Sequence, residues 1–390
     1  MESSPFSSLY ELYNYVIATL KELGSYKWLF FGLIITHLLI GALTSPLVTS
    51  DFKHNLFYGE AFWKYGFRVY DLTPTQIDPE YKIYDPTSGI LSYPNTTYDY
   101  PTVQLLFWVG VSILPCSEII GKWILSSFDI LNFFLIYYLL KQIVGKSGEI
   151  DLPEKGFTLS YLLFSIPFSA FEGQSTAITI TFLLLPLVLH PYHKYWSYLS
   201  IGLGFHWKYV SLLVLPYLLI KDRNDIKKAI FGLFLAFSVI GLLSFPILFS
   251  NFILNYFGFF GRLGDYSGQK PSNNLLIFHI CISSILSSGI LVLAFLHWLG
   301  ISISEMKIRI SFEGLSKRAY LIPFMILLIF LKIYPTAFPW YWMWFYPLLA
   351  IFPIKENRLY TKLLGVTFVV GLIDFVDMTV GIETFLGYFI

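Results

Sequence analysis

Apolar runs long enough to cross a membrane recur along most of the chain. A helix needs roughly 17 to 25 mostly apolar residues to span about 30 Å of hydrocarbon. The runs 196–206 and 208–220 are each too short to cross alone, so we expect a broken hairpin that meets at His206-Trp207-Lys208. In all we predict about 11 transmembrane helices, near residues 28–48, 119–140, 157–171, 175–190, 196–206, 208–220, 229–250, 274–299, 319–336, 338–353 and 361–378.

One long polar stretch, residues 49–118, interrupts this pattern after the first span. Residues 54–69 have apolar and aromatic positions at helical spacing, which predicts a helix lying on the membrane surface. The apolar run 101–114 is about 14 residues long and too short for a full span, so we predict an interfacial or re-entrant helix. The acidic residues of the stretch are Asp51, Glu60, Asp71, Asp78, Glu80, Asp85, Asp99 and Glu118.

The positions of Lys and Arg predict the orientation of the chain, because these residues concentrate in cytoplasmic loops. We interpret residues 1–27 as a cytoplasmic, amphipathic lead-in and residues 28–390 as one transmembrane domain. The stretch 49–118 is then the first extracytoplasmic loop. With this orientation the basic clusters fall on the cytoplasmic side, at residues 141–155, 221–228, 307–318 and 355–362. Counting 101–115 as a span would place the later clusters outside.

Composition agrees with a membrane protein and argues against several other classes. Hydrophobic residues make up 56% of the chain and charged residues 13%, whereas about 25% of a soluble domain is charged. A net charge of +1 without a dense basic cluster argues against a nucleic-acid partner. The 2 cysteines, and the absence of a zinc motif or a phosphate-binding glycine loop, lead us to expect no metal and no cofactor. Too few polar residues remain for a nucleotide-sugar-binding domain.

Two polar groups next to spans are candidates for chemistry on hydroxyl groups. Asp51 follows the first span, where a partly desolvated carboxylate suits a general base. It is equally well explained as a solvated residue at the start of the next helix. Glu172-Gly173-Gln174 connects two spans, and Glu172 and Gln174 offer acceptors and donors to sugar hydroxyls. An ordinary polar turn explains this connection as well.

Lysines inside predicted spans are candidates for binding an anion. An ammonium group in a membrane is costly, and such residues usually pair with a functional anion. Lys208 lies at the break of the predicted hairpin, and we predict that it binds a phosphate with His206 as a second donor. Lys332, in a later span, is a second candidate cation. Snorkelling of the ammonium to the interface is the alternative explanation.

Aromatic residues beside acids complete the set of candidates. Asp99 and Tyr100 begin the interfacial run, and either could contact a sugar, while Asp99 could also pair with a cation. Trp340 belongs to the aromatic stretch 334–347, whose rings could stack on sugar faces. An aromatic belt at the membrane interface explains this stretch equally well.

The order of these motifs resembles the GT-C class of glycosyltransferases. The motifs are Ser50-Asp51-Phe52, Tyr98-Asp99-Tyr100-Pro101, Glu172-Gly173-Gln174-Ser175, Lys208 and the segment from Pro339 to Pro347. Within the class the chain looks most like the prokaryotic polyprenyl-phosphate-mannose-dependent α-mannosyltransferases, over about residues 28–350. The resemblance implies that Asp51 is the catalytic base, that Gln174 lies by the sugar and that Lys208 lies by the donor phosphate.

We therefore expect an all-α, multi-pass membrane glycosyltransferase with an extracytoplasmic site. It would transfer a hexose, by the resemblance mannose, from a polyprenyl- or dolichyl-phosphate sugar to a glycan or glycolipid acceptor, with inversion. Spans rich in Tyr, Ile and Leu are typical of an AT-rich, for example archaeal, source, for which dolichyl phosphate is the expected carrier. A transporter or flippase for a lipid-linked or small polar substrate is the alternative, because broken helices also line transport paths. A non-catalytic subunit would leave Lys208 unexplained.

Overall fold

The computed structural model describes four long ranges of the chain and several single residues further on. The ranges are 9–45, 49–84, 91–144 and 152–250, and the later residues are 291, 292, 295, 299, 301, 302, 307, 308, 322, 325, 326, 343 and 344. The chain divides into two compact units, Met1–Leu212 with Ile230–Ile253 and Leu213–Ala229 with Leu254–Ile390. Nearly all described residues belong to the first unit. The predicted spans from residue 274 onward lie wholly or largely outside the described residues.

Helices form nearly all of the regular structure in the described ranges. The longer helices are α1 (Leu9–Glu22), α2 (Lys27–Leu43), α3 (Ser50–Tyr65), α5 (Thr102–Ser112), α6 (Ser117–Val144), α7 (Leu152–Ser165), α8 (Thr176–Leu189), α9 (Lys194–Phe205) and α11 (Ile226–Leu248). The shorter ones are η1 (Gly24–Tyr26), η3 (Gly66–Tyr70), α4 (Pro74–Ile77), the π-helix η4 (Ile166–Phe171), η5 (Tyr209–Val214) and α10 (Leu215–Lys221). Two short antiparallel strands, β1 (Ile301–Ser302) and β2 (Lys307–Ile308), pair Ile301 with Ile308.

The expectation of a helical membrane protein is confirmed at this level. Three described helical segments, Gly24–Leu43, Ser117–Gln142 and Ile226–Leu248, are long and apolar enough to cross a membrane. They coincide with predicted spans 28–48, 119–140 and 229–250. The total of about 11 spans stays a prediction.

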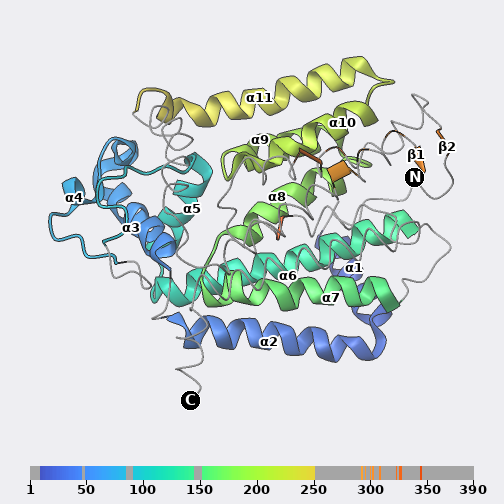
Figure 1. The fold of residues 1–390 in the computed structure, drawn as a ribbon, viewed down its shortest axis with the longest axis horizontal. Coiled ribbons are helices and arrows are strands. Elements are labelled where there is room, and N and C mark those ends of the chain that lie inside the picture. Colours follow the sequence, from blue (N-terminus) through green and yellow to red (C-terminus); the bar gives the residue numbers. More distant parts are fainter. Residues whose placement is uncertain are drawn as a thin grey trace. The chain divides into compact units, whose positions relative to one another are not determined.

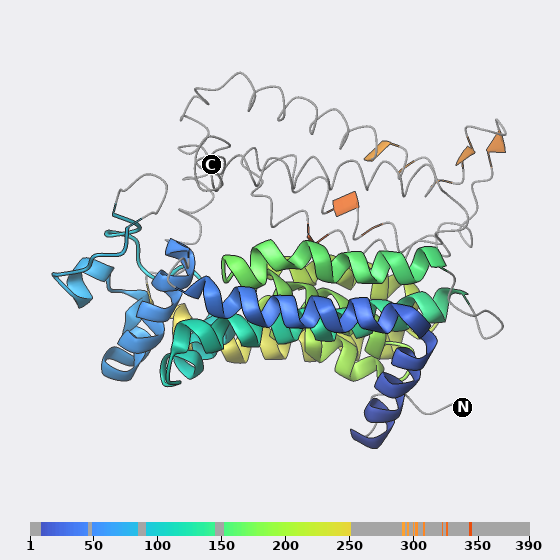
Figure 2. The same cartoon turned by 90° about the horizontal axis from the view of Figure 1, so that it is seen from below.

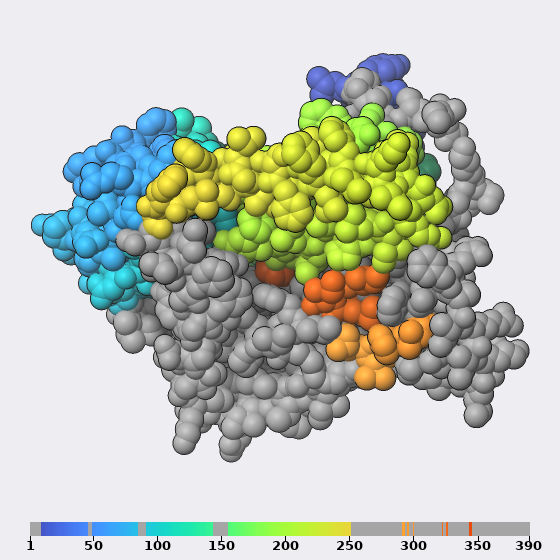
Figure 3. All heavy atoms as spheres, turned by 90° about the horizontal axis from the view of Figure 1, so that it is seen from above, coloured from blue at the N-terminus to red at the C-terminus, as the bar shows by residue number. Residues whose placement is uncertain are grey.

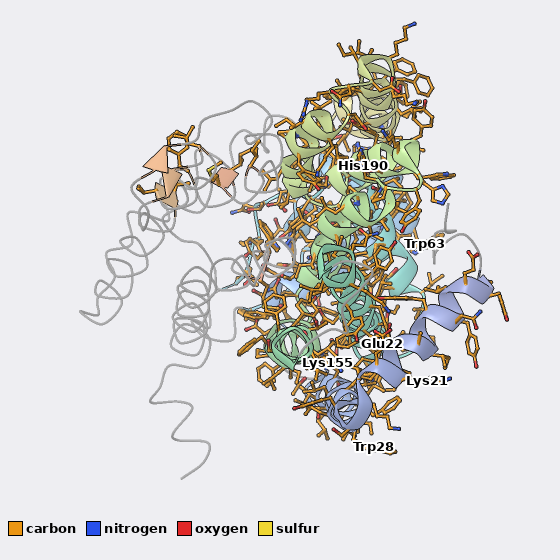
Figure 4. The ribbon with its side chains drawn as sticks, turned by 90° about the vertical axis from the view of Figure 1, so that its right-hand side faces the viewer. Lys21, Glu22, Trp28, Trp63, Lys155 and His190 are labelled. Atoms are coloured by element: carbon orange, nitrogen blue, oxygen red, sulfur yellow. The ribbon has the colours of Figure 1, made fainter. Side chains whose placement is uncertain are left out.

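Within the first unit α6 is the central helix. It packs against α2, α7, η4 and α8, and α9 packs against α8, so that Figure 1 shows α2, α6, α8 and α9 in succession across the bundle. About 67% of the apolar window of α6 is buried, against 22% for that of α2 and 17% for that of α11. The helices α2 and α11 therefore present the apolar faces that a bilayer would cover. Trp28 at the edge of α2 (Figure 4) and the exposed side of α11 (Figure 3) belong to these faces.

The helices of the polar stretch gather at one end of the bundle. Figures 1 and 2 show α3 and α4 beyond one end of α2, while α1 lies at its other end. α3 packs closely on α5: a Cβ on Gly59 would lie 2.5 Å from the carbonyl oxygen of Trp108. α5 has 11 residues and is about 16 Å long at 1.5 Å per residue. The prediction of a short helix at 101–114 is confirmed.

Two predicted boundaries can be compared directly with the structure. The predicted surface helix 54–69 begins four residues too late, because α3 starts at Ser50 and ends at Tyr65. The predicted break at 206–208 is confirmed: α9 ends at Phe205 and η5 begins at Tyr209. A further interruption precedes α8, where the π-helix η4 is followed by the non-helical residues 172–175.

A group of buried polar side chains links the helices at the centre of the bundle. Asn132 donates to the Tyr161 hydroxyl (2.9 Å) and the Ala177 carbonyl (2.8 Å), and it accepts from Thr181 (2.8 Å). Tyr161 in turn donates to Asp129 (2.7 Å). The members of this buried polar network are His37, Asp129, Asn132, Tyr161, Ser165 and Thr181. It connects α2, α6, α7 and α8 through hydrogen bonds that no lipid could replace.

Candidate functional site

The segment that carries Asp51 is fixed to the connection before α8. Thr49 caps α3, because its hydroxyl accepts from the backbone N–H of Phe52 at 3.3 Å. The same hydroxyl donates to the carbonyl oxygen of Glu172 (3.2 Å), and the Thr49 backbone N–H points to that oxygen as well (3.4 Å). Asp51 therefore lies in the first turn of a capped helix, where the positive end of the helix dipole favours a carboxylate.

Both carboxylate oxygens of Asp51 accept a hydrogen bond from a side chain far away in the sequence. The Tyr93 hydroxyl donates to Oδ1 at 2.8 Å, and Nε2 of Gln174 donates to Oδ2 at 3.5 Å. The backbone of Tyr93 has φ of 52°, a left-handed conformation that costs a residue with a side chain about 1 to 3 kcal/mol. Strained residues of this kind cluster at functional sites. The half-buried Asp51 carboxylate is thus held in one orientation.

The connection that carries Glu172 and Gln174 packs directly on α3. Gly173 has φ of +74°, and a Cβ there would collide with the ring of Phe52. Glu172 is 2% exposed, and neither of its carboxyl oxygens has a hydrogen-bond partner within the described part of the chain. It lies between two helical segments, outside the predicted spans. Burial, reinforced by the charge of Asp51 and opposed by that of Lys122, raises the pKa of Glu172 well above its ordinary value.

A second set of contacts runs from α3 through Tyr98 to Tyr100 and Lys208. Asn55, one turn after Asp51 on α3, donates to the Asp51 carbonyl (2.7 Å) and accepts from the Tyr98 hydroxyl (3.0 Å). The Lys208 ammonium lies 5.8 Å from the centre of the Tyr100 ring. Burial of this ammonium group is costly, and the charges of Asp51 and Asp99 offset only part of that cost. We call Asp51, Tyr93, Glu172, Gln174 and Lys208 together the Asp51 site: Tyr93 and Gln174 bind the Asp51 carboxylate, and its charge acts on Glu172 and Lys208.

Lys122, at the start of α6, lies next to the Asp51 site, where it contacts the residue before Glu172. It is 0% exposed, and its ammonium donates to the Thr44 carbonyl (2.7 Å), the Thr44 hydroxyl (2.9 Å) and the Phe171 carbonyl (2.6 Å). An ammonium has three N–H donors, so these three acceptors satisfy it. Its charge is felt by Glu172, the residue that follows Phe171.

The remaining predicted site residues lie elsewhere or outside the described residues. Nε2 of His206 contacts the Ile240 carbonyl on α11 (2.9 Å) and the Ser244 hydroxyl (3.4 Å), so the ring is turned toward α11. The backbone carbonyl of His206 accepts from Gln104 (3.2 Å). Lys332 and Trp340 lie outside the described residues.

Sequence reasoning did not identify Tyr93 or Lys122. For Tyr93 no local signal exists, since it is one of 28 tyrosines. For Lys122 a signal was present, because it lies within the predicted span 119–140, where a charged residue is unusual. Its acceptors, Thr44 and Phe171, could not be known before the fold.

Within the described ranges, no group of three or more His, Cys, Asp or Glu side chains is arranged to hold a metal ion. Comparisons of the chain with protein-family models, curated proteins and solved structures gave no match. A functional assignment therefore rests on the chemistry of the Asp51 site itself.

Proposed function

We propose that this protein is an integral membrane glycosyltransferase that uses a polyprenyl- or dolichyl-phosphate sugar as donor. The observation that carries the proposal is the Asp51 site. Its carboxylate is held by Tyr93 and Gln174, and the ammonium group of Lys208, above the Tyr100 ring, lies close enough for the charge of Asp51 to act on it. A base, an amide that can bind hydroxyls and a cation are the groups that sugar transfer from a lipid phosphate uses. The resemblance to the GT-C class supports the same choice.

The proposed reaction is an inverting transfer in one step. Asp51 accepts the proton of an acceptor hydroxyl while that oxygen forms a bond to the anomeric carbon. On the opposite face the bond from this carbon to the phosphate oxygen breaks, and its electron pair leaves with the lipid phosphate. The ammonium of Lys208 stabilises the charge that develops there, which in a poorly hydrated site is a large contribution. Tyr93 and Gln174 orient the base.

The proposal includes the sugar, the acceptor and the side of the membrane. The sugar is a hexose, with mannose as the first choice, and the acceptor is a lipid-linked or other glycan. Glu172, Gln174, Asp99 and Tyr100 contact the sugar or the acceptor. The site faces the extracytoplasmic side of a protein with about 11 spans and a cytoplasmic N-terminus, which the distribution of basic residues supports.

Sugar transfer by the purified protein in liposomes tests the proposal. Radiolabelled dolichyl-phosphate mannose and dolichyl-phosphate glucose are supplied with total membrane lipid as acceptor. Asp51→Asn is expected to lower the rate by about 10²- to 10⁴-fold, the range typical of losing a general base. Asp78→Asn is the matched control, because this exposed carboxylate belongs to the same stretch and only caps a turn through the Glu80 N–H. It is expected to keep the wild-type rate.

The result separates the proposal from its alternative. Equal rates in wild type and Asp51→Asn would remove Asp51 as the base. The interruptions at 172–175 and 206–208 also suit a transport path. Absence of transfer from either donor, together with movement of a fluorescent lipid-linked sugar across the bilayer, would replace the transferase by a flippase.

A further inference from the structure

We infer that Lys122 is a positioning residue for Asp51. Its hydrogen bonds join the end of α2 to the segment 171–172, and this junction fixes the position of the helix that carries Asp51. The inference rests on the proposed function for its effect on rate. The geometric part, that Lys122 keeps Thr49 hydrogen-bonded to the Glu172 carbonyl, is independent of any reaction. Lys122 touches neither Asp51 nor the predicted substrate groups through a hydrogen bond, so its influence runs through the backbone.

The first link is the ammonium group itself. Its hydrogen bonds to both Thr44 oxygens and to the Phe171 carbonyl bring the end of α2 and the end of the π-helix η4 to one point. The Thr44 hydroxyl donates to the Ile40 carbonyl (2.7 Å), so it has a lone pair available for the lysine. A hydrophobic side chain at position 122 would leave these oxygens without their common donor.

The second link is the adjoining residue. The Glu172 carbonyl, one residue after the carbonyl that Lys122 holds, accepts from both the backbone N–H and the hydroxyl of Thr49. That hydroxyl caps the helix in which Asp51 occupies the first turn. The two ends of the connection from α2 to α3, Thr44 and Thr49, are therefore tied to consecutive residues, Phe171 and Glu172.

The burial of Lys122 is explained by this role. A buried ammonium costs free energy even when its hydrogen bonds are made, and replacement by an apolar residue often does not harm stability. A buried lysine that binds carbonyl and hydroxyl oxygens, and no carboxylate, is therefore not expected to add much to the free energy of unfolding. It does fix backbone positions, since each N–H is directed at one oxygen.

Variants of Lys122 and Thr49, assayed for sugar transfer, test the effect on rate. Lys122→Met is expected to lower kcat by about 10- to 100-fold, because a displacement near 1 Å costs up to about 100-fold. KM should change by less than about twofold, whereas Lys122→Arg, which keeps the donors, should restore most of kcat. Thr49→Val should lower kcat similarly, and the double variant should be no worse than about twofold below the lower single one. Lys141→Met, on the exposed part of α6, is the matched control.

A disulfide cross-link tests the positioning without any reaction. Cys116 and Cys281 are replaced by Ser, and cysteines are introduced as Thr49→Cys and Glu172→Cys. These changes keep the backbone contact from the N–H of residue 49 to the carbonyl of residue 172, which holds the two cysteines together. With Lys122 present, copper phenanthroline should join them rapidly. With Lys122→Met, the rate should fall by roughly fivefold or more, because a disulfide needs a narrow range of Cα separations. If Lys122→Met does not fold, Thr44→Val, which removes one acceptor, takes its place.

The outcomes separate the two ideas. If no protein, wild type included, transfers sugar, but Lys122→Met still slows the cross-link, the proposed function is refuted and the positioning role remains. An unchanged cross-linking rate, or effects of Lys122→Met and Thr49→Val on kcat that multiply, would overturn the inference.

Discussion

The Asp51 site and the buried polar network both place ionisable side chains near the bundle of the first unit, but they differ in how their polar atoms are satisfied. In the network, Asn132 and Tyr161 exchange hydrogen bonds with Asp129 and Thr181, and all four side chains are at most 5% exposed. Among their polar atoms, only Oδ2 of Asp129 has no hydrogen-bond partner in the described part of the chain. At the Asp51 site the carboxylate is half-buried, and Glu172 has no hydrogen-bond partner in the described part of the chain. Buried groups that are almost all hydrogen-bonded hold helices together, whereas at the Asp51 site a carboxyl group without a hydrogen-bond partner lies beside the half-buried carboxylate of the proposed base.

After the loss expected for Asp51→Asn, the largest effect is expected when the cation of the Asp51 site is removed. Lys208→Met should lower kcat for sugar transfer by about 10²- to 10³-fold, because a fixed charge that stabilises the leaving group is lost. The melting temperature should stay the same or rise, since burying part of an ammonium group opposes folding. Rates are measured in liposomes and melting in detergent. A normal rate in a folded Lys208→Met protein would argue against a role in catalysis.

The next effect should appear in stability and not in rate. Asn132→Leu deletes two donated hydrogen bonds and one accepted hydrogen bond. The hydroxyls of Thr181 and Tyr161 then each lose one hydrogen bond. We expect a loss of about 2 to 3 kcal/mol in unfolding free energy. The rate per folded molecule should remain within about twofold of wild type. Denaturant unfolding in detergent and assays of the folded fraction check this, and a rate loss without destabilisation would place the network in the reaction.

A smaller effect depends on pH. Because the pKa of Glu172 is raised in the folded protein, its contribution to stability is fully present below the ordinary carboxyl pKa of about 4.3. It is lost as the pH rises through the raised value, at about 1.4 kcal/mol per pH unit. Glu172→Gln should therefore melt like wild type near pH 4 and at a higher temperature than wild type near pH 8. A constant difference across this range would show that Glu172 keeps an ordinary pKa.

The smallest effect concerns Tyr93. Tyr93→Phe removes the hydrogen bond to Oδ1 of Asp51 and leaves the ring. A hydrogen bond to a charged group contributes about 1.5 to 3 kcal/mol, and Gln174 still orients the carboxylate, so we expect a loss of about fivefold in kcat/KM. Tyr84→Phe, in the same stretch, is the control. Equal kcat/KM in all three proteins would show that Tyr93 does not orient the base.

The sequence predicted the parts of the fold that depend on local patterns. The helices α2 and α6 follow from apolar runs, and the break at 206–208 follows from two runs that are each too short. The start of α3 was misplaced because its cap, Thr49, is fixed by Glu172, which is remote in sequence. Asp51 and Gln174 were both predicted as site residues, and the structure brings them together. Tyr93 was not predicted, because only the folded stretch carries its hydroxyl to Asp51.

The bond between Thr49 and Glu172 also sets an order of events during synthesis. Asp51 emerges early, whereas the oxygen that holds its helix belongs to a residue made after α6 and α7. Lys208 emerges later still, and at about 5 to 20 residues per second the delay after Asp51 is roughly 8 to 30 s. Until Glu172 is made, Thr49 lacks this hydrogen-bond partner, and α2, α6 and α7 are synthesised before it. The Asp51 site is therefore completed only after the helices α2, α6 and α7 have been synthesised.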